Sequence, residues 1–459
     1  MSTHHITRRD FIKTAALALP VVAAGCAGAQ TNSSGPARVR KASGEFARVR
    51  NGRFELRGRP YFYVGTNLWY GCYLADPALP GGRQRLVREL DRLQGIGVNN
   101  IRLLAGSETS PLVGAIPRGI TRAPHDWDED LLKGLDFCLA EMARRDMRGI
   151  LFLSNYWQWS GSFAQYVRWI TGETIPDPDL PVMAKGNWAG FMRFSARFYT
   201  TPAAVALYRD YVTSLVHRRN TVNGRLYRDD PAIMTWELAN EPRPGTDDAS
   251  DASVRVYVKW VDETARFIHD QDPNHLVCTG SEGIWGCLKK PEVFIQAHET
   301  PAINYVTVHM WLKNWGWLKD PQLGPEYEKA AARARDHVEQ HTVIATDTLH
   351  KPLVLEEFGL PRDHEKYDPV SPTAARDDYY HRMFEQVADS CQAGRALQGA
   401  NFWTWGGEGR VGVGKPDSAT ALTGDPFCEP QGLNSVFDTD KGTLAVVAKA
   451  NEKLVAIAG

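Results

Sequence analysis

Two glutamates, Glu241 and Glu357, follow predicted β-strands, and hydrolysis of a glycosidic bond needs such a pair of carboxyl groups. One carboxylic acid protonates the leaving oxygen, while the other carboxylate attacks the anomeric carbon. A mechanism that retains configuration places the two groups about 5–5.5 Å apart. A single glutamate at a strand end more often forms a structural salt bridge, and Glu237, Glu282 and Glu356 compete for the same roles. The residues around the pair must therefore show which of these glutamates cleave the bond.

The polar residues at the other predicted strand ends suit this chemistry. A cation such as Arg102 keeps a nearby carboxylate ionised, whereas the acid partner must stay protonated. The candidate substrate-binding residues at these ends are Trp69, Arg102, Asn155, Asn240, His309, Trp311 and Trp403. The strand ends supply one histidine and no His-x-His pair, so we expect neither a metal nor a cofactor.

These residues need a scaffold that brings strand ends together. Short apolar segments alternate with amphipathic ones, which predicts parallel strands joined by helices. The predicted strands are Tyr61–Thr66, Val98–Leu104, Gly149–Ser154, Ala232–Ala239, Leu276–Gly280, Tyr305–His309, Pro352–Glu356 and Gly399–Thr404. Eight such units favour a (β/α)8 TIM barrel, an α/β fold whose active sites lie at the carboxyl ends of the strands. An open doubly wound sheet is the alternative, but the glycine-rich nucleotide-binding turn is missing.

Apolar residues recur at helical spacing between these strands. The predicted helices are Arg83–Gln94, Leu131–Arg145, Pro202–His217, Ser253–His269 and one that begins after Thr373. Thr201 and Thr373 are the predicted caps of two of them. The largest insertion, residues 156–230, separates the third and fourth strands. Nothing divides residues 45–459, so we expect one catalytic domain.

The first residues are typical of an export signal. Thr7–Lys13 (TRRDFIK) matches a twin-arginine motif, and the apolar stretch Ala15–Ala24 is too short to span a bilayer. Cys26 ends a segment that resembles a bacterial lipobox, with cleavage after Ala29 as the alternative. We therefore expect a signal peptide over 1–29 and a flexible tether over 30–44. The protein is expected in the periplasm or cell envelope, with possible membrane anchoring through lipidated Cys26, or secreted.

Composition narrows the class of partner. A formal net charge of -1 gives no large field, so nucleic acid and anionic membrane surfaces are not expected partners. The 14 Trp, 16 Tyr and 17 Phe suit stacking on sugars, although aromatic residues also fill cores. The cysteines after Cys26 form no CxxC motif, and their pairing stays open. Oligomeric state is open too, with a monomer as the default expectation.

Two longer motifs carry a family resemblance. Trp236–Pro242 (WELANEP) and Leu355–Gly359 (LEEFG) resemble the signature segments of glycoside hydrolase family 5. Tyr227–Arg243, Gly65–Asn67 and Phe402–Gly407 are similar to its endo-β-1,4-mannanase branch. The similarity extends over essentially all of residues 45–459.

The resemblance implies a role for several residues. Glu241 would be the acid/base, with Asn240 on the sugar 2-hydroxyl, and Glu357 the nucleophile. Glu237 would be structural, and Glu356 would point to the other face of its strand. Arg102 would lie beside the nucleophile, His309 near the reacting sugar, and Trp403 beneath it.

One position departs from the family pattern. Many members have a tyrosine two residues after the histidine, and here that residue is Trp311, which donates only through its indole N–H. Either the indole replaces the hydroxyl or the polar contact is lost. The tryptophans at positions 69, 157, 159, 315 and 317 lie on strand-end loops and could line sugar subsites or pack.

The resemblance implies a retaining endo-β-1,4-mannanase that cleaves mannan, glucomannan or galactomannan by double displacement. The alternatives are a β-1,4-glucanase or an exo-β-mannosidase of the same family. A non-catalytic glycan-binding lipoprotein is a different class, and it would have lost a carboxylate that is present here.

Overall fold

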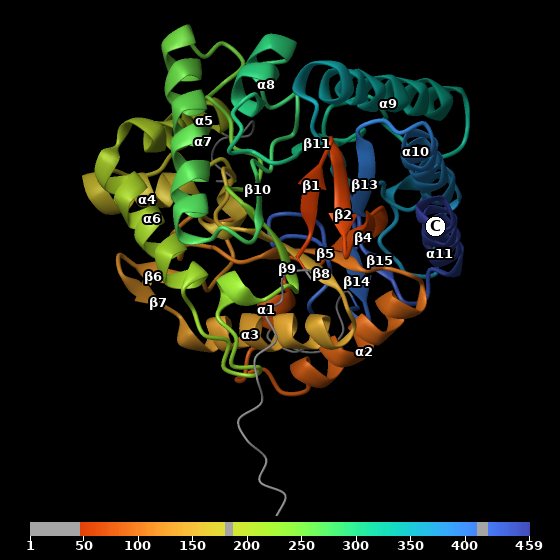
Figure 1. The fold of residues 1–459 in the computed structure, drawn as a ribbon, viewed down its shortest axis with the longest axis horizontal. Helices are drawn as coiled ribbons and strands as arrows, with labels where there is room; N and C mark the ends of the chain where they lie inside the picture. The colour runs from red at the N-terminus through yellow and green to blue at the C-terminus, as the bar shows by residue number, and fades with distance from the viewer. Residues whose placement is uncertain (1–45, 180–186, 411–420) are drawn as a thin grey trace, which may run out of the picture. The chain divides into compact units, whose positions relative to one another are not determined.

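A computed structural model describes residues 46–179, 187–410 and 421–459 (Figure 1). The predicted signal peptide, lipobox and tether lie outside the described residues. None of the described helices has the length and hydropathy of a membrane-spanning segment.

Eight parallel strands form the central sheet, in the order β10-β9-β8-β5-β4-β13-β12-β11. They are β4 (Tyr63–Asn67), β5 (Asn100–Leu104), β8 (Arg148–Phe152), β9 (Ile233–Glu237), β10 (Leu276–Cys278), β11 (Val306–Met310), β12 (Leu353–Phe358) and β13 (Leu397–Phe402). Each overlaps one predicted strand, which confirms the TIM-barrel prediction. The end strands β10 and β11 approach each other where Thr307 Oγ1 donates to the Ser281 carbonyl at 2.8 Å.

Helices surround the strands (Figure 1). They are α1 (Gly71–Leu74), α2 (Gly82–Gly95), α3 (Glu129–Arg144), α4 (Phe163–Thr171), α5 (Trp188–Ala196), α6 (Pro202–Val216), α7 (Asp251–Gln271), α8 (Pro291–His298), α9 (Pro325–Ile344), α10 (Ala374–Gln392) and α11 (Lys441–Ala458). Single turns lie at Gln158–Ser160, Arg197–Thr200, Tyr227–Asp229, Ala345–Leu349 and Asp363–Glu365. The predicted helices are α2, α3, α6, α7 and α10, and the insertion over 156–230 contains α4, α5 and α6.

The two predicted threonine caps were wrong in chemistry although right in place. Thr373 precedes α10, but its hydroxyl donates to Asp377, and Asp363 accepts from the first helical amides, Ala374 N and Ala375 N, at 3.2 and 3.0 Å. The Thr201 hydroxyl likewise turns back to a carbonyl of the preceding turn. A cap can thus come from a residue distant in sequence, which local patterns do not reveal.

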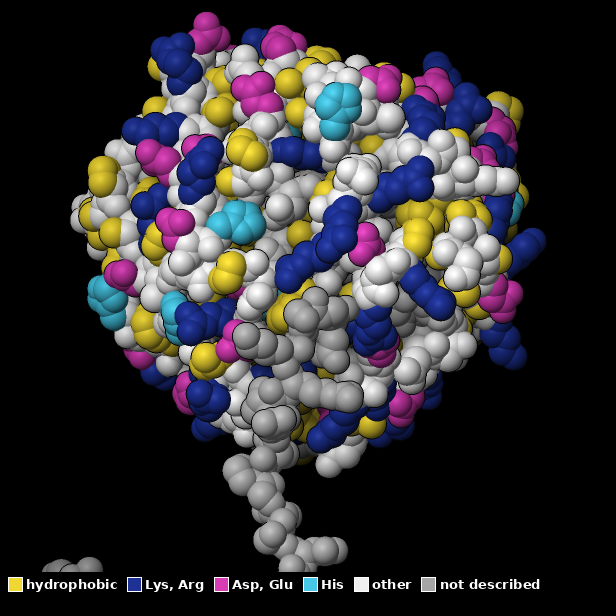
Figure 2. All heavy atoms as spheres, in the orientation of Figure 1, with side chains coloured by type: hydrophobic (Ala, Val, Ile, Leu, Met, Phe, Trp, Pro, Cys, Tyr) yellow, Lys and Arg dark blue, Asp and Glu magenta, His cyan; other side chains and the backbone are white. Residues whose placement is uncertain are grey.

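Short strands outside the barrel complete the fold. They are β1 (Arg48–Arg50), β2 (Arg53–Leu56) and β3 (Arg59–Pro60) in one sheet, with the pairs β6 (Thr121–Ala123) and β7 (Asp126–Trp127), and β14 (Trp405–Gly407) and β15 (Val436–Phe437, parallel to β14). The β1–β3 sheet places Phe54 against Tyr63 and Tyr305, which begin or precede barrel strands. This sheet therefore seals the amino end of the barrel. On the face seen in Figure 2, both signs of charge are scattered, as the net charge suggests.

We expect the Phe54→Ala change to lower the free energy of unfolding by about 3–5 kcal/mol, because it opens a cavity under a side chain with no exposed surface. Chemical denaturation measures this loss. The value of kcat/KM at 25 °C is expected to stay at the wild-type level, because Phe54 packs at the end of the barrel away from the strand-end carboxylates. A parallel loss of kcat/KM would contradict a purely structural role.

Candidate active site

Arg102 of β5 organises the carboxyl end of the barrel. Its Nε and Nη2 donate to the two oxygens of Glu237 at 2.8 and 2.6 Å, and Nη1 contacts Glu357. The same guanidinium donates to Asn67 Oδ1 at 3.1 Å and to Asn240 Oδ1 at 2.8 Å. None of the Arg102 side chain is exposed. Glu237 is therefore held in a buried two-point ion pair, while Glu357 faces the same cation from the other side.

Glu241 and Glu357 meet at one histidine. His309 Nδ1 lies 2.6 Å from Glu241 Oε1 and 3.3 Å from Glu357 Oε2. One carboxylate oxygen of each glutamate lies within 4.8 Å of the other. That separation suits a retaining pair at about 5–5.5 Å and is short of the 6.5–9.5 Å typical of inverting pairs. Glu241 also has a φ of 52°, a left-handed conformation that is uncommon outside glycine and concentrates at functional sites.

Burial and charge set the proton balance of this pair. Burial raises the pKa of Glu241 and raises that of Glu357 well above the usual range, while Arg102 opposes the shift of Glu357. Two carboxylates this close cannot both ionise freely, so the pair retains a proton. Arg102 contacts Glu357 directly and favours the charge on that carboxylate. Burial lowers the pKa of His309, which is therefore neutral near pH 7.

Two indoles act on Glu241. Trp157 Nε1 donates to Glu241 Oε2, and this hydrogen bond and the Trp311 indole lower the pKa of Glu241 against the effect of burial. The sequence left open whether the Trp311 indole replaces a tyrosine hydroxyl. The Trp311 indole favours the ionised form of Glu241.

We expect Trp311→Phe to shift the alkaline limb of kcat/KM to higher pH by about one unit, because a hydrogen bond to an ionised group is lost. Without that donor the pKa of Glu241 rises, so Glu241 stays protonated to higher pH. Trp157→Phe is expected to shift the limb in the same direction. Trp159→Phe, at another tryptophan of the cleft, is the matched control and leaves the limb in place. A shift to lower pH in the Trp311 variant would contradict this assignment.

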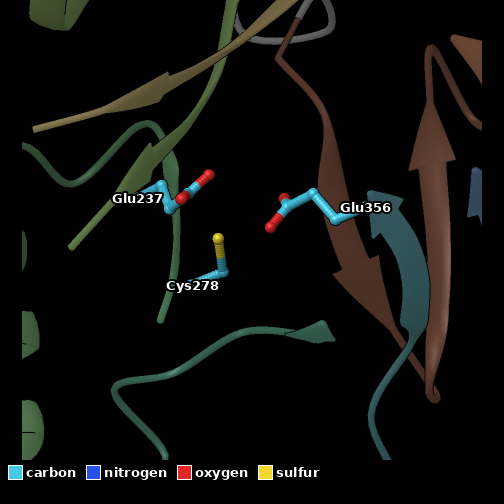
Figure 3. Close-up of side chains that lie close together, drawn as sticks. All are labelled: Glu237, Cys278 and Glu356. Carbon is cyan, nitrogen blue, oxygen red and sulfur yellow. The ribbon is translucent and has the colours of Figure 1, made fainter. Parts of the chain in front are cut away.

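The prediction that Glu356 points to the opposite face of its strand was wrong. The register of β12 against β11 pairs Val308 with Leu355 and His309 with Glu357, so Glu356 is the extra residue of a β-bulge. The bulge breaks strict alternation between the two glutamates, so both side chains face the barrel interior, where Arg102 Nε lies 3.7 Å from Glu356 Oε2 and Arg102 Nη1 contacts Glu357. Figure 3 shows its carboxyl group directed toward Glu237 and Cys278.

The buried carboxylates of the site belong to two clusters whose ligand atoms lie close enough together to hold a cation. Glu237, Cys278 and Glu356 form the deeper one, and Glu241, His309 and Glu357 the upper one. Arg102 already occupies both oxygens of Glu237 and contacts Glu357. The guanidinium thus supplies the positive charge that faces both clusters.

A cleft of about 360 Å³ opens above the pair. Of the predicted residues, those that line it are Trp157, Trp159, Asn240, Glu241, Trp311, Trp315, Glu357 and Trp403. Arg102 and His309 contact the pair from below. Asn155 also lies behind the surface, where its Oδ1 accepts from Asn240 Nδ2 at 3.1 Å.

Trp69 is buried beneath the cleft. Its ring packs edge-on against Trp159 with centroids 5.4 Å apart, and its indole donates to the Gly424 carbonyl at 2.6 Å. Because Trp69 is almost completely buried, its contact with a sugar stays a prediction.

Trp188, Arg243, Trp285 and Glu429 are among the cleft residues that the sequence did not single out. Arg243 donates to Glu282 Oε2 at 2.5 Å and lies over the Trp157 ring at 4.9 Å. Burial raises the pKa of Glu282 to about 7 and that of Glu429 to about 8. Arg243 directly follows the Asn-Glu-Pro motif, and that position could have marked it as a site residue. Trp188 and Glu429 come from long loops with no local pattern.

Comparisons with known proteins agree with this geometry. Residues 44–458 match the profile of a family described as "GH family 5 beta-mannosidase-like". The chain is 30% identical over 387 residues to a putative mannan endo-1,4-beta-mannosidase 4 of Arabidopsis thaliana, covering 80% of this chain and 85% of the relative. A mannan endo-1,4-beta-mannosidase 1 of Oryza sativa subsp. japonica is 30% identical, with 80% of each covered.

Among solved structures, a glycoside hydrolase family 5 mannosidase from Rhizomucor miehei superposes with a TM-score of 0.81 at 34% identity, covering 90% of this chain and 98% of that one. An endo-1,4-beta-mannanase of the same organism shares the fold, with a TM-score of 0.64 at 20% identity, over 90% of this chain and 99% of the other. The paired glutamates, the arginine beneath them and a match over nearly the whole barrel lead to one conclusion: the chain belongs to glycoside hydrolase family 5, in its β-mannosidase-like group.

Proposed function

We propose that this protein hydrolyses β-1,4-mannosidic bonds with retention, with Glu357 as nucleophile and Glu241 as acid/base. The observation that carries the proposal is the approach of the two carboxylates to within 4.8 Å at His309 Nδ1. The alternative of a non-catalytic glycan-binding protein does not account for two buried carboxylates at this spacing.

The reaction has two balanced steps. Glu357 attacks the anomeric carbon as the bond to the leaving oxygen breaks, and Glu241 gives that oxygen its proton. The product is a covalent glycosyl-enzyme. In the second step Glu241, now ionised, takes a proton from water, whose oxygen attacks the anomeric carbon and displaces Glu357.

The surrounding side chains suit these steps. Arg102 stabilises the charge of Glu357 before attack and when it leaves. Asn240 is held by Arg102 and Asn155, which orients its amide toward the sugar 2-hydroxyl. Trp403, 4% exposed, provides the platform beneath the reacting sugar.

A mannoside is the preferred substrate in this proposal, since the family description and the relatives named above refer to mannosidases. The sequence favoured cleavage inside a polymer, but a wall of loops favours cleavage at a chain end. Gly114, after β5, lies so close to the loops after α4 and β13 that an added Cβ would be 2.1 Å from Asp179 Oδ2 and 2.9 Å from Cys428 Cβ. The Phe427 ring packs against Trp69 at 6.4 Å.

This wall borders the cleft, because Cys428 and Glu429 line it together with Trp403. The leaving group must lie over Glu241, so the sugar being released occupies the Trp403 side. We therefore propose that the enzyme removes mannose from non-reducing ends. Internal cleavage by an endo-mannanase is the second candidate, supported by the names of the plant relatives.

Digestion of borohydride-reduced mannohexaose, followed by chromatography, tests the proposal. Mannose as the first product, with slow loss of viscosity on galactomannan, is the expected result. Early release of longer oligosaccharides would favour the endo-mannanase instead. Proton NMR of the first product gives the anomer, and an initial α-anomer would contradict retention. A panel with glucomannan, xylan and carboxymethyl-cellulose tests the sugar, and activity on cellulose alone would contradict mannoside preference.

A further inference from the structure

Glu356 is a buried carboxyl group that the proposed mechanism does not use. Its side chain has no exposed surface, and within the described part of the chain neither oxygen has a hydrogen-bond partner. A buried carboxyl group without a partner loses the free energy of its hydration and gains nothing in return. A neighbouring group must therefore form a hydrogen bond with the Glu356 carboxyl group.

The candidates for that partner can be compared atom by atom. Arg102 Nε lies 3.7 Å from Glu356 Oε2, but its single hydrogen is already donated to Glu237 at 2.8 Å. Cys278 offers only a thiol, which is a weak donor. His309 Nε2 lies 3.7 Å from the same oxygen and, among the described residues, has no hydrogen-bond partner of its own. Glu356 Oε2 and His309 Nε2 thus lie close together, each without another partner among the described residues. A small rotation of the Glu356 side chain brings them within hydrogen-bond distance.

The other face of the His309 ring decides the direction of this bond. Nδ1 faces the oxygens of Glu241 and Glu357 at 2.6 and 3.3 Å. A proton on Nδ1 can be donated to these acceptors, and Nε2 of a neutral ring is then an acceptor. Its partner must in that case donate, which a carboxyl group can do only when it is protonated.

We propose that Glu356 is a positioning residue that works as a neutral carboxylic acid, donating to His309 Nε2 and so fixing the His309 proton on Nδ1 between Glu241 and Glu357. The inference rests on the proposed double displacement, since it assigns a partner to the histidine shared by the two reacting carboxylates. In the opposite tautomer Nδ1 would accept the proton of Glu241 and compete with the leaving oxygen for it.

The charges around Glu356 support the neutral form. The titratable groups that face it from the packed strands are Tyr63 in β4, Arg102 in β5, Glu237 in β9, Cys278 in β10, and Tyr305 and His309 at β11. Arg102 is the single cation among them, and Glu237 and Glu357 already contact it. A third carboxylate would leave this buried network with excess negative charge. Burial and then Glu237 raise the pKa of Glu356 in agreement.

Variants of Glu356 test the proposal. Glu356→Leu removes the donor, so we expect kcat to fall by about 100-fold or more with a smaller change in KM. Glu356→Gln restores a donor through its amide, and we expect it to recover activity to within about tenfold of the wild type. The same change at the neighbouring carboxylate, Glu237→Gln, is the matched control. It is expected to be harmful, because Glu237 acts as an anion toward Arg102.

The pH profile separates this role from a merely structural one. Replacing a neutral acid by an amide changes no charge, so both limbs of the kcat/KM profile of Glu356→Gln are expected within about half a unit of the wild type. If Glu356 were ionised, the Gln change would remove a negative charge and move both limbs to lower pH. Such a shift, or a Gln variant as inactive as the Leu variant, would overturn the proposal.

Two further readouts keep the result interpretable. The ¹⁵N shifts of histidine in the wild type are expected to show His309 protonated on Nδ1 and bare on Nε2, and the reverse pattern would overturn the proposal. If the Leu variant does not fold, the pH profile of the Gln variant decides alone. An inactive wild type on β-mannosides would instead reject the proposed function, whereas the tautomer measured by NMR would still test Glu356.

Discussion

Replacing Glu357 by alanine is expected to lower kcat on manno-oligosaccharides by at least about 10⁴-fold, because no covalent intermediate can form without the nucleophile. Azide is small enough to enter the space left by the carboxylate and attack the anomeric carbon directly. Because this is a single displacement, the product with an aryl β-mannoside is expected to be α-mannosyl azide. Product NMR with added azide measures both the rescue and its stereochemistry.

The fold of the Glu357→Ala variant is expected to persist, since Arg102 keeps its two-point ion pair with Glu237. Circular dichroism and the thermal midpoint check this. Glu408→Ala is the control, because Glu408 pairs with Arg88 at 2.6 Å and does not contact the catalytic pair. Near wild-type turnover without azide in the Glu357 variant would reject Glu357 as the nucleophile.

Replacing Glu241 by alanine is expected to have an effect that depends on the leaving group. A natural mannoside needs its leaving oxygen protonated, so kcat/KM on mannobiose is expected to fall by about 10²–10⁴-fold. A dinitrophenyl mannoside needs little protonation, so it should still form the glycosyl-enzyme, which then accumulates because no base activates water. A burst of dinitrophenol followed by slow turnover is the signal.

Azide identifies the role of Glu241 by the opposite stereochemistry. It attacks the accumulated intermediate in a second displacement, so the product is expected to be β-mannosyl azide. An α product from the Glu241 variant and a β product from the Glu357 variant would exchange the two assignments. An equal loss on activated and natural substrates would show that Glu241 acts in folding or binding and not as the acid.

The barrel could be predicted because its signal is local. Each strand is a short apolar run between amphipathic segments, and periodicity reports directly on that arrangement. Cap residues were predicted less well. Asp363 and α10 are joined by a loop whose geometry depends on the tertiary structure, and so Thr373 seemed the natural cap.

The site could be predicted in its residue types but not in its geometry. The NEP and EFG motifs marked Glu241 and Glu357 through the family resemblance. That Glu356 and Glu357 face the same side could not follow from alternation, because a β-bulge changes the register of one strand against its neighbour and leaves no mark in the sequence. The contacts of Gly114 with Asp179 and Cys428 join loops from three parts of the chain, and loop-to-loop packing of this kind has no period to read.

The position of the three-stranded sheet β1–β3 also determines from which side the protein can be attached to a support. The described chain begins beside it, with Phe46 against His275 just before β10 at a ring distance of 5.1 Å, whereas the carboxylates of Glu241 and Glu357 lie at the opposite ends of the strands. A bead, a surface or an anchoring group joined upstream of Phe46 would thus hold the barrel by its sealed base. The open end would face outward, and a bulky glycan could approach it without passing the support.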